Sequence, residues 1–304
     1  MASTWDVVGL GENSVDYVYR LPMAPEPNAK LPISSHRLLL GGQVATTLAT
    51  CATLGLRTTY VGSFGSDDNG ARIREALAQR GVDTTHAVIR PTSNRHAVIL
   101  VDERTGDRTV LWERDPALAL NAYDVPQAVI AGARLLHVDD VDEEAAIAAA
   151  GVARAAGIPV TSDLDRVGTR TEALVAAVTI PIFAEQVPAA LTGEGDVERA
   201  LRKLRRTHTG LLCVTLGSRG AMLLDGDQLH HVPAPRVDAV DATGAGDVFR
   251  GGFIYALLRG DAAPDILRFA NAAAALSCTR PGAMDSVPTL AEVETLATKG
   301  TTGC

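Results

Sequence analysis

The sequence predicts an α/β fold in which a mostly parallel sheet is covered by helices on both faces. Short apolar runs alternate with longer, alanine-rich stretches through most of the chain, and this alternation is typical of parallel strands joined by helices. The strands are also continuously apolar, which is typical of a sheet with two buried faces. With 304 residues, of which 46% are hydrophobic, the chain is long enough to bury a large core.

The individual elements are assigned in chain order, with the short apolar runs as strands and the longer periodic stretches as helices. The predicted strands are residues 6–10, 59–62, 134–138, 159–162, 179–183, 211–215 and 221–224. The predicted helices are residues 44–54, 71–80, 143–156, 197–207, 245–258, 265–277 and 290–296. The predicted helices lie between the predicted strands or follow them, as expected for a sheet covered by helices on both faces.

Two segments depart from this alternation and predict a second, smaller sheet. Residues 14–20 alternate small or polar side chains with valine and tyrosine and then enter a proline-rich stretch. Residues 96–101 and 108–112 flank turn residues 104–107 and form a strand pair with no helix between them. We expect this sheet to project from the main body and to close over a ligand as a lid that excludes water. An ordinary edge hairpin is the alternative.

The lid hypothesis divides the chain into two parts. The core comprises residues 1–12, 38–92 and 113–304, and the lid comprises residues 13–37 and 93–112. Because an exposed sheet has free edges that pair with other chains, a homodimer through the lid is a further expectation.

Composition argues against several classes of partner. The chain has 28 basic and 36 acidic residues and a net charge of −8, so we expect no nucleic-acid partner held by phosphate neutralisation. No apolar span reaches membrane length, and no basic and apolar leader is present, so we expect no membrane partner and a cytoplasmic location. The four cysteines are far apart and form no Cys-x-x-Cys pair, which indicates no metal motif.

One short segment carries the clearest chemistry. Residues 240–247 read Val-Asp-Ala-Thr-Gly-Ala-Gly-Asp and precede an apolar helical stretch. The free N–H groups and the positive dipole end at a helix start suit an anion, which indicates a phosphate site. Asp247, in the first turn, is interpreted as a base that accepts a proton from an attacking hydroxyl. The alternative is a plain glycine turn in which Asp247 only complements the helix dipole.

A second glycine-rich helix start predicts the acceptor side of the site. Gly41 and Gly42 open the alanine-rich helix, and paired glycines let a ligand approach the backbone closely. Together with Asp16 and Asp247, they predict a polyol site in which carboxylates and backbone groups bind hydroxyls. An isolated helix start without a ligand is the alternative. The chain contains no Gly-x-x-x-x-Gly-Lys-Ser/Thr phosphate loop, so ATP would be held in another way.

These motifs together resemble the ribokinase-like, or PfkB, sugar kinases over nearly the whole chain. The family's Asp-Thr-x-Gly-Ala-Gly-Asp signature matches residues 241–247, with Ala242 in place of the usual threonine. Its glycine pair, helix and Leu-Gly match residues 41–55, and its Gly-x-x-Gly-x-Asp-x-x-Gly pattern matches residues 62–70. The resemblance implies a ribokinase-like three-layer sandwich with a small β-sheet lid, and an ATP-dependent kinase that uses Mg²⁺ and K⁺.

The resemblance also implies a role for each matching residue. The catalytic set is Asp247 as base, with the backbone N–H groups of Gly244, Ala245 and Gly246 as the anion hole. The substrate-binding set is Asn13, Asp16, Gly41, Gly42, Gln43, Thr46, Asp139 and Asp247. The nucleotide-binding set is Thr215, Gly217, Ser218, Gly220, Gly244, Gly246 and Asn271. The set around a monovalent cation is Asp241, Thr243, Ser277, Arg280, Gly282 and Ser286.

The chain departs from the family pattern in three places that bear on function. Ser14, rather than asparagine, stands two residues before Asp16. Thr46 replaces the usual asparagine and Gln43 replaces the lysine of ribokinases, which makes ribose itself a less favoured acceptor. The family's Asn-x-x-Glu motif is also missing, because Ala184 and Val187 occupy its positions. This absence shifts the handling of magnesium to Glu185 or to one of the aspartates at positions 163 and 165.

The sequence therefore predicts an ATP-dependent kinase that acts on a primary hydroxyl of a small sugar, ketose or sugar acid. A nucleoside kinase of the same family is an alternative, although only 4% of the residues are aromatic and few are available to stack a base. A degenerate regulator that binds a sugar or nucleotide is a second alternative, motivated by the departures from the pattern. Arg250, one turn after Gly246, is interpreted as a helix residue, with contact to a phosphate as the alternative.

Overall fold

The computed structural model describes residues 4–299 of the chain. Within these residues the main sheet has nine strands, in the order β15-β14-β13-β12-β11-β10-β1-β4-β6. The strands are β1 (Trp5–Leu10), β4 (Thr58–Val61), β6 (Val82–Asp83), β10 (Ala133–Asp139), β11 (Val160–Leu164), β12 (Ile180–Ala184), β13 (Leu212–Thr215), β14 (Ala221–Asp225) and β15 (Gln228–Val232). All neighbouring pairs are parallel except β13–β14 and β14–β15, which confirms the predicted mostly parallel sheet.

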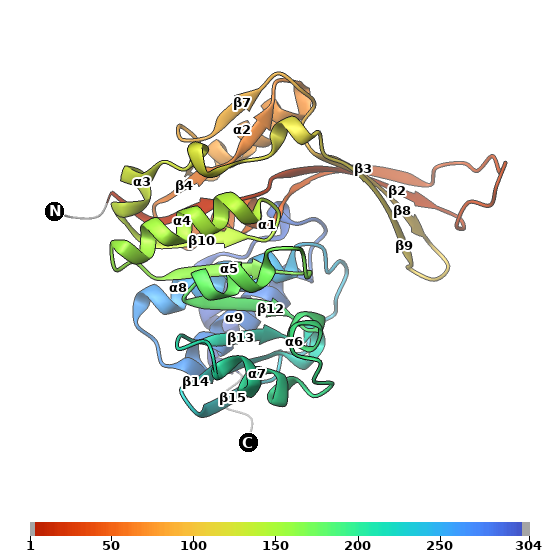
Figure 1. Cartoon of the computed structure of the whole chain (residues 1–304). Helices are drawn as coiled ribbons and strands as arrows, with labels where there is room; N and C mark the ends of the chain where they lie inside the picture. Colours follow the sequence, from red (N-terminus) through yellow and green to blue (C-terminus); the bar gives the residue numbers. More distant parts are fainter. Residues whose placement is uncertain (1–3, 300–304) are drawn as a thin grey trace.

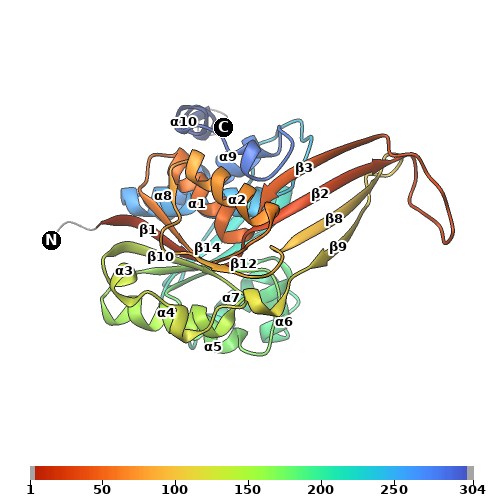
Figure 2. The ribbon, with the colours of Figure 1, turned by 90° about the horizontal axis from the view of Figure 1, so that it is seen from above.

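Helices cover both faces of this sheet, as Figure 2 shows. One face carries α1 (Gln43–Thr53), α2 (Asp68–Gln79), α8 (Ala245–Arg259), α9 (Ala263–Ser277) and α10 (Leu290–Lys299). The other carries α3 (Gln127–Ala131), α4 (Glu143–Ala155), α5 (Thr171–Ala177), α6 (Gln186–Thr192) and α7 (Val197–Arg205). The strands between them are almost fully buried, because apolar residues leave water on both faces.

The core includes one histidine that the apolar strand around it predicts to be structural. His137 on β10 is fully buried, and its Nδ1 lies 3.0 Å from the Thr161 hydroxyl on β11. Burial lowers the pKa of His137 to about 3, because an apolar environment disfavours the charged form. The ring is therefore a neutral part of the core.

A separate four-stranded sheet extends away from the main body (Figure 1). Its order is β3-β2-β8-β9, built from β2 (Ser14–Leu21), β3 (Ser35–Gly41), β8 (His96–Asp102) and β9 (Arg108–Glu113). The predicted strand pair across the 104–107 turn is present as β8 and β9. Strand β3 is an addition to the prediction. A further small sheet pairs β5 (Ser63–Gly65) with β7 (Val88–Arg90).

The outer strand β9 of this second sheet is exposed along its whole length. Its side chains include Val110, Leu111 and Trp112, of which Trp112 is 62% exposed. Strands β9 and β3 are the two edges of this sheet, through which the sequence predicts a homodimer. The structure describes a single chain, so the dimer and the assignment of the sheet as a lid stay predictions. In residues 4–299 no helix is long and apolar enough to cross a membrane.

Candidate active site

The predicted phosphate loop and the start of α8 form one edge of the site. Gly244 precedes the helix in the left-handed conformation, with φ 75° and ψ 2°. A Cβ at this position would lie 2.6 Å from the Ala283 Cβ and 2.8 Å from the Ala283 Cα. Only glycine therefore fits here. No side chain caps α8, so N–H groups of its first turn can bind an anion, although the Ala245 N–H donates to the Ala242 carbonyl over 3.2 Å.

Asp247 lies in this first turn, next to several other charges. Its main-chain carbonyl accepts a 3.1 Å hydrogen bond from the Thr47 hydroxyl, which ties α8 to α1. Desolvation is the largest influence on the carboxyl and raises its pKa to about 8; Arg250 opposes this rise and Asp165 adds to it. A carboxyl with a pKa near neutrality is well matched to general-base chemistry.

A buried ion pair lies beside Asp247. Asp163 on β11 is fully buried, and its Oδ1 lies 2.5 Å from the Arg250 Nη2 on α8. The same nitrogen donates to Asp165 over 3.2 Å. Asp165 in turn accepts a 3.1 Å hydrogen bond from the Gln43 Nε2 at the start of α1. These contacts join the two glycine-rich helix starts, and sequence reasoning did not find them.

The acceptor side forms where β2 and β3 meet α1. Gly42 has φ 99°, and a Cβ there would lie 2.4 Å from the Asn13 Cα. Beside it, the position that a Cβ would take on Gly41 is 4.0 Å from the Asp16 Oδ2 and 3.8 Å from the Thr46 Oγ1. The Thr46 hydroxyl is buried and has no hydrogen-bond partner among the described residues. An unsatisfied buried hydroxyl is costly unless a ligand bonds to it.

Two predicted substrate residues make contacts to the protein instead. The amide of Asn13 donates to the Tyr60 hydroxyl over 2.8 Å and to the Ser63 carbonyl over 2.7 Å. Asp139 accepts a 2.6 Å hydrogen bond from the Glu12 N–H. These bonds fix the turn that leads from β1 into β2. Asp16 itself accepts a 2.5 Å hydrogen bond from the Ser14 hydroxyl and pairs with Arg95 over 3.2 Å. Direct contact of Asn13 or Asp139 with a substrate stays a prediction.

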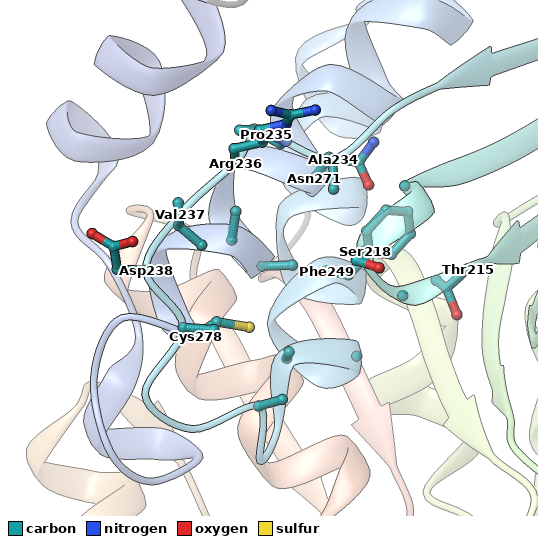
Figure 3. Close-up of a pocket in the computed structure, with 18 residues that line it drawn as sticks. Thr215, Ser218, Ala234, Pro235, Arg236, Val237, Asp238, Phe249, Asn271 and Cys278 are labelled. Atoms are coloured by element: carbon teal, nitrogen blue, oxygen red, sulfur yellow. The ribbon is translucent and has the colours of Figure 1, made fainter.

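A cavity of about 850 Å³ adjoins the start of α8 (Figure 3). It is lined by six of the predicted nucleotide residues, namely Thr215, Gly217, Ser218, Gly220, Gly246 and Asn271. Gly244 is not among the lining residues. The loop 234–239 forms a further wall that sequence reasoning missed. Pro233 and Pro235 mark this segment as a loop, but nothing in the local sequence shows which cavity it borders.

The predicted cation loops converge on Asp241. Its Oδ1 accepts from the Thr243 N–H over 2.9 Å and its Oδ2 from the Gly282 N–H over 3.0 Å. The hydroxyls of Ser277 and Ser286 donate to nearby carbonyls of their own segments. Arg280 pairs with a glutamate of α10. These residues lie close together, but K⁺ binding stays a prediction.

The predicted magnesium residues do not gather into a metal site. Glu185 pairs with Arg219, while Asp163 pairs with Arg250. No group of three or more histidine, cysteine, aspartate or glutamate side chains in residues 4–299 could hold a metal ion. Residues 4–299 therefore do not supply a complete set of ligands for Mg²⁺.

The second sheet also reaches the phosphate loop. Arg108, at the start of β9, donates from Nη1 to the Thr243 hydroxyl over 3.1 Å. Thr243 directly precedes Gly244. One strand of this sheet is therefore in contact with the loop that leads into α8.

A sequence profile of the pfkB family of carbohydrate kinases matches residues 6–290. The chain belongs to this family. The family prediction is confirmed, and this pfkB-family kinase is a phosphotransferase whose acceptor is an alcohol group. Its relatives include ribokinases, fructokinases and nucleoside kinases, so it is a sugar or nucleoside kinase.

Two relatives and one solved structure illustrate the similarity. A ribokinase from Haemophilus influenzae is 28% identical over 291 residues, which cover 93% of this chain and 95% of that protein. A nucleoside kinase from Methanothermobacter thermautotrophicus is 26% identical over 297 residues, covering 96% and 95%. The structure of Arabidopsis thaliana ribokinase complexed with ribose and ATP is 26% identical, covers 98% of this chain and 99% of that one, and has a TM-score of 0.85. The predicted ribokinase-like fold is therefore confirmed.

Proposed function

We propose that this pfkB-family kinase transfers the γ-phosphoryl group of ATP to a primary hydroxyl of a small sugar, ketose or sugar acid. One observation carries the proposal: Asp247 follows Gly246, which borders the nucleotide cavity, and its pKa is also raised by the charge of Asp16 on the acceptor side. These two observations support a position for Asp247 between the two substrates of a transfer reaction.

In this mechanism, Asp247 accepts the proton of the acceptor hydroxyl while that oxygen attacks the γ-phosphorus. The bond from phosphorus to the β,γ-bridging oxygen breaks, and ADP leaves. The N–H groups at Gly244, Ala245 and Gly246 stabilise the charge on the transferring group. The second sheet acts as the lid and keeps water from competing as acceptor.

Metal ions would supply charge to this reaction, and the chain contributes few ligands for Mg²⁺. Bound Mg²⁺ would neutralise part of the charge on the phosphates of ATP, and we assign its ligands mainly to those phosphates and to water. Glu185 could reach it only by leaving Arg219. For K⁺, the proposed site comprises the loops around Asp241 and Gly282, where backbone carbonyls rather than the engaged serine hydroxyls would bind it.

The acceptor side favours a sugar. Thr46 contributes a buried hydroxyl that has no partner within residues 4–299, and Asp16 contributes a carboxylate, both of which bind hydroxyls well. A nucleoside is the second candidate, because the rings of Tyr17 and His96 meet edge to face on neighbouring strands of the lid, with centroids 6.3 Å apart. These are the two rings that would stack on a base.

A coupled ADP-release screen tests the function. Wild-type protein would be assayed with Mg²⁺-ATP and with ketoses, aldoses, sugar acids and nucleosides, with and without K⁺. We expect sugar-dependent ADP release that exceeds the release with any nucleoside. Higher kcat/KM for a nucleoside would replace the sugar assignment with the nucleoside one. No acceptor-dependent release would support the degenerate regulator.

The pH dependence of the same assay tests the base. Asp247 must be deprotonated to accept a proton, so kcat/KM is expected to rise with pH through about 8, the pKa of that carboxyl. Asp165→Asn removes a negative charge that raises this pKa, so the rise should move to lower pH. The exposed Asp227→Asn is the matched control and should leave the profile unchanged. A profile that Asp165→Asn does not move would contradict the assignment.

A further inference from the structure

Arg250 is a buried charged residue next to the phosphate loop. It lies on α8 one turn after Gly246 and is only 2% exposed. A Cβ on Gly246 would lie 2.7 Å from the Arg250 Nη1. The guanidinium therefore fills the space that a side chain at position 246 would need. The absence of a Cβ at Gly246 is what lets this cation approach the backbone of the anion hole.

The two ends of the guanidinium have different surroundings. Nη2 faces Asp163 at 2.5 Å and Asp165 at 3.2 Å. Every hydrogen bond and ion pair of this side chain in residues 4–299 is made by Nη2, the buried Nε has no hydrogen-bond partner there, and Asp247 adds a further negative charge near the guanidinium. Neither carboxylate oxygen of Asp163 has a hydrogen-bond partner by distance and angle among residues 4–299, so its contact with Arg250 is the ion pair alone, and Asp247 is the other carboxyl that it influences. A buried cation is retained only with such compensation.

The ion pair of Asp163 and Arg250 thus fixes the position of the guanidinium. It leaves Nη1 of Arg250 next to Gly246. Gly246 also borders the nucleotide cavity. The transferring phosphoryl group gains its charge on three equatorial oxygens, and a preorganised guanidinium is well suited to bind them. A donor at this place supplements the backbone N–H groups, whose combined partial charge is only about half an elementary charge.

We infer that Arg250 is a catalytic residue whose Nη1 donates to the γ-phosphoryl group at the start of α8, so that the anion hole of this chain includes a side-chain cation. Asp163 is its positioning residue. The inference rests on the proposed function, because it assumes that the γ-phosphoryl lies at Gly244 to Gly246. Arg250 stays protonated throughout, while the phosphoryl leaves ADP and joins the acceptor oxygen.

The test separates contact with the γ-phosphate from a merely structural role. Calorimetry would measure the Kd of Mg²⁺-ADP and of the Mg²⁺ complex of β,γ-imido-ATP for the wild type and for Arg250→Gln. We expect the variant to bind ADP within about twofold of wild type but to bind the triphosphate about tenfold more weakly. Its kcat should fall by about 10²-fold, as it does when an oxyanion-hole donor is removed. Arg259→Gln, on the same helix and paired with Asp261, is the matched control and should change neither value.

A double variant controls for loss of stability, because Arg250→Gln alone leaves Asp163 as an unpaired buried charge. Asp163→Asn with Arg250→Gln removes both charges and should recover the thermal stability of the wild type, but neither kcat nor the preference for triphosphate. Recovery of both in the double variant would overturn the inference, since Arg250 would then only neutralise Asp163. The binding measurements need no acceptor. They therefore test Arg250 even if the ADP-release screen fails.

Discussion

Replacing Asp247 with alanine is expected to lower kcat about 10³-fold, within the range that a general base contributes, while the Kd of ATP stays within about twofold of wild type. The two effects separate because the proposed base is a side chain and the proposed anion hole is backbone. Alanine keeps the backbone of α8 and the bond from the Thr47 hydroxyl to the carbonyl of residue 247. Kinetics with the best acceptor and a nucleotide titration would measure both quantities.

Stability supplies a second readout for the same change. Partial burial already disfavours the charged form of Asp247, whose pKa is raised to about 8. Its removal should therefore not lower the melting temperature. Asp247→Asn keeps the shape of the side chain but cannot accept the proton, so it should lose as much turnover as the alanine variant. Near-wild-type turnover in either variant would exclude Asp247 as the base.

Gly244→Ala is expected to abolish measurable turnover and to lower the free energy of unfolding by about 2 to 4 kcal/mol, from left-handed strain plus overpacking. The backbone has φ 75° here, and the added methyl group would lie 2.8 Å from the Ala283 Cα. Either the 282–284 segment or the start of α8 must then move. Such a movement displaces the N–H groups that the mechanism uses. Denaturant unfolding and the ADP-release assay would measure the two losses.

Gly260→Ala is the matched control for this change. Gly260 ends the same helix with φ 87°, and no atom lies within 4 Å of the position of its Cβ. This variant should therefore lose only about 1 to 2 kcal/mol of unfolding free energy, from the strain of alanine in the left-handed conformation. It should retain full turnover. If Gly244→Ala and Gly260→Ala behaved alike, close packing against Ala283 would have no role in the site.

Local signals predicted much of the fold and part of the site. The helix predicted at residues 245–258 is α8, Ala245–Arg259, because apolar periodicity and a glycine turn are both contained in the segment itself. Strand β3 was missed, since it follows a proline-rich stretch and is stabilised by pairing with β2. Strands β5, β6, β7 and β15 and helices α3, α5 and α6 were missed as well. These elements are short, and short elements carry little periodic signal.

The contacts that distinguish this site are between distant parts of the chain. The ion pair of Asp163 and Arg250 joins β11 to α8, and no pattern in either segment indicates the other. Glu185 had the right chemistry for a metal, but the structure pairs it with Arg219. Asn13 is a similar case, because its amide is used by Tyr60 and Ser63. Residue type alone does not reveal which partner a polar group will find.

On the proposed function, the contact between Arg108 and Thr243 would link the binding of the acceptor to the binding of the nucleotide. An acceptor that orders β9 and a nucleotide that orders the loop before α8 would both favour the state in which this bond is formed. Coupling between two ligands is reciprocal, so the factor by which one tightens the other must be the same in both directions. If the proposed lid closes over the acceptor, this bond is therefore a route to cooperative binding of the two substrates.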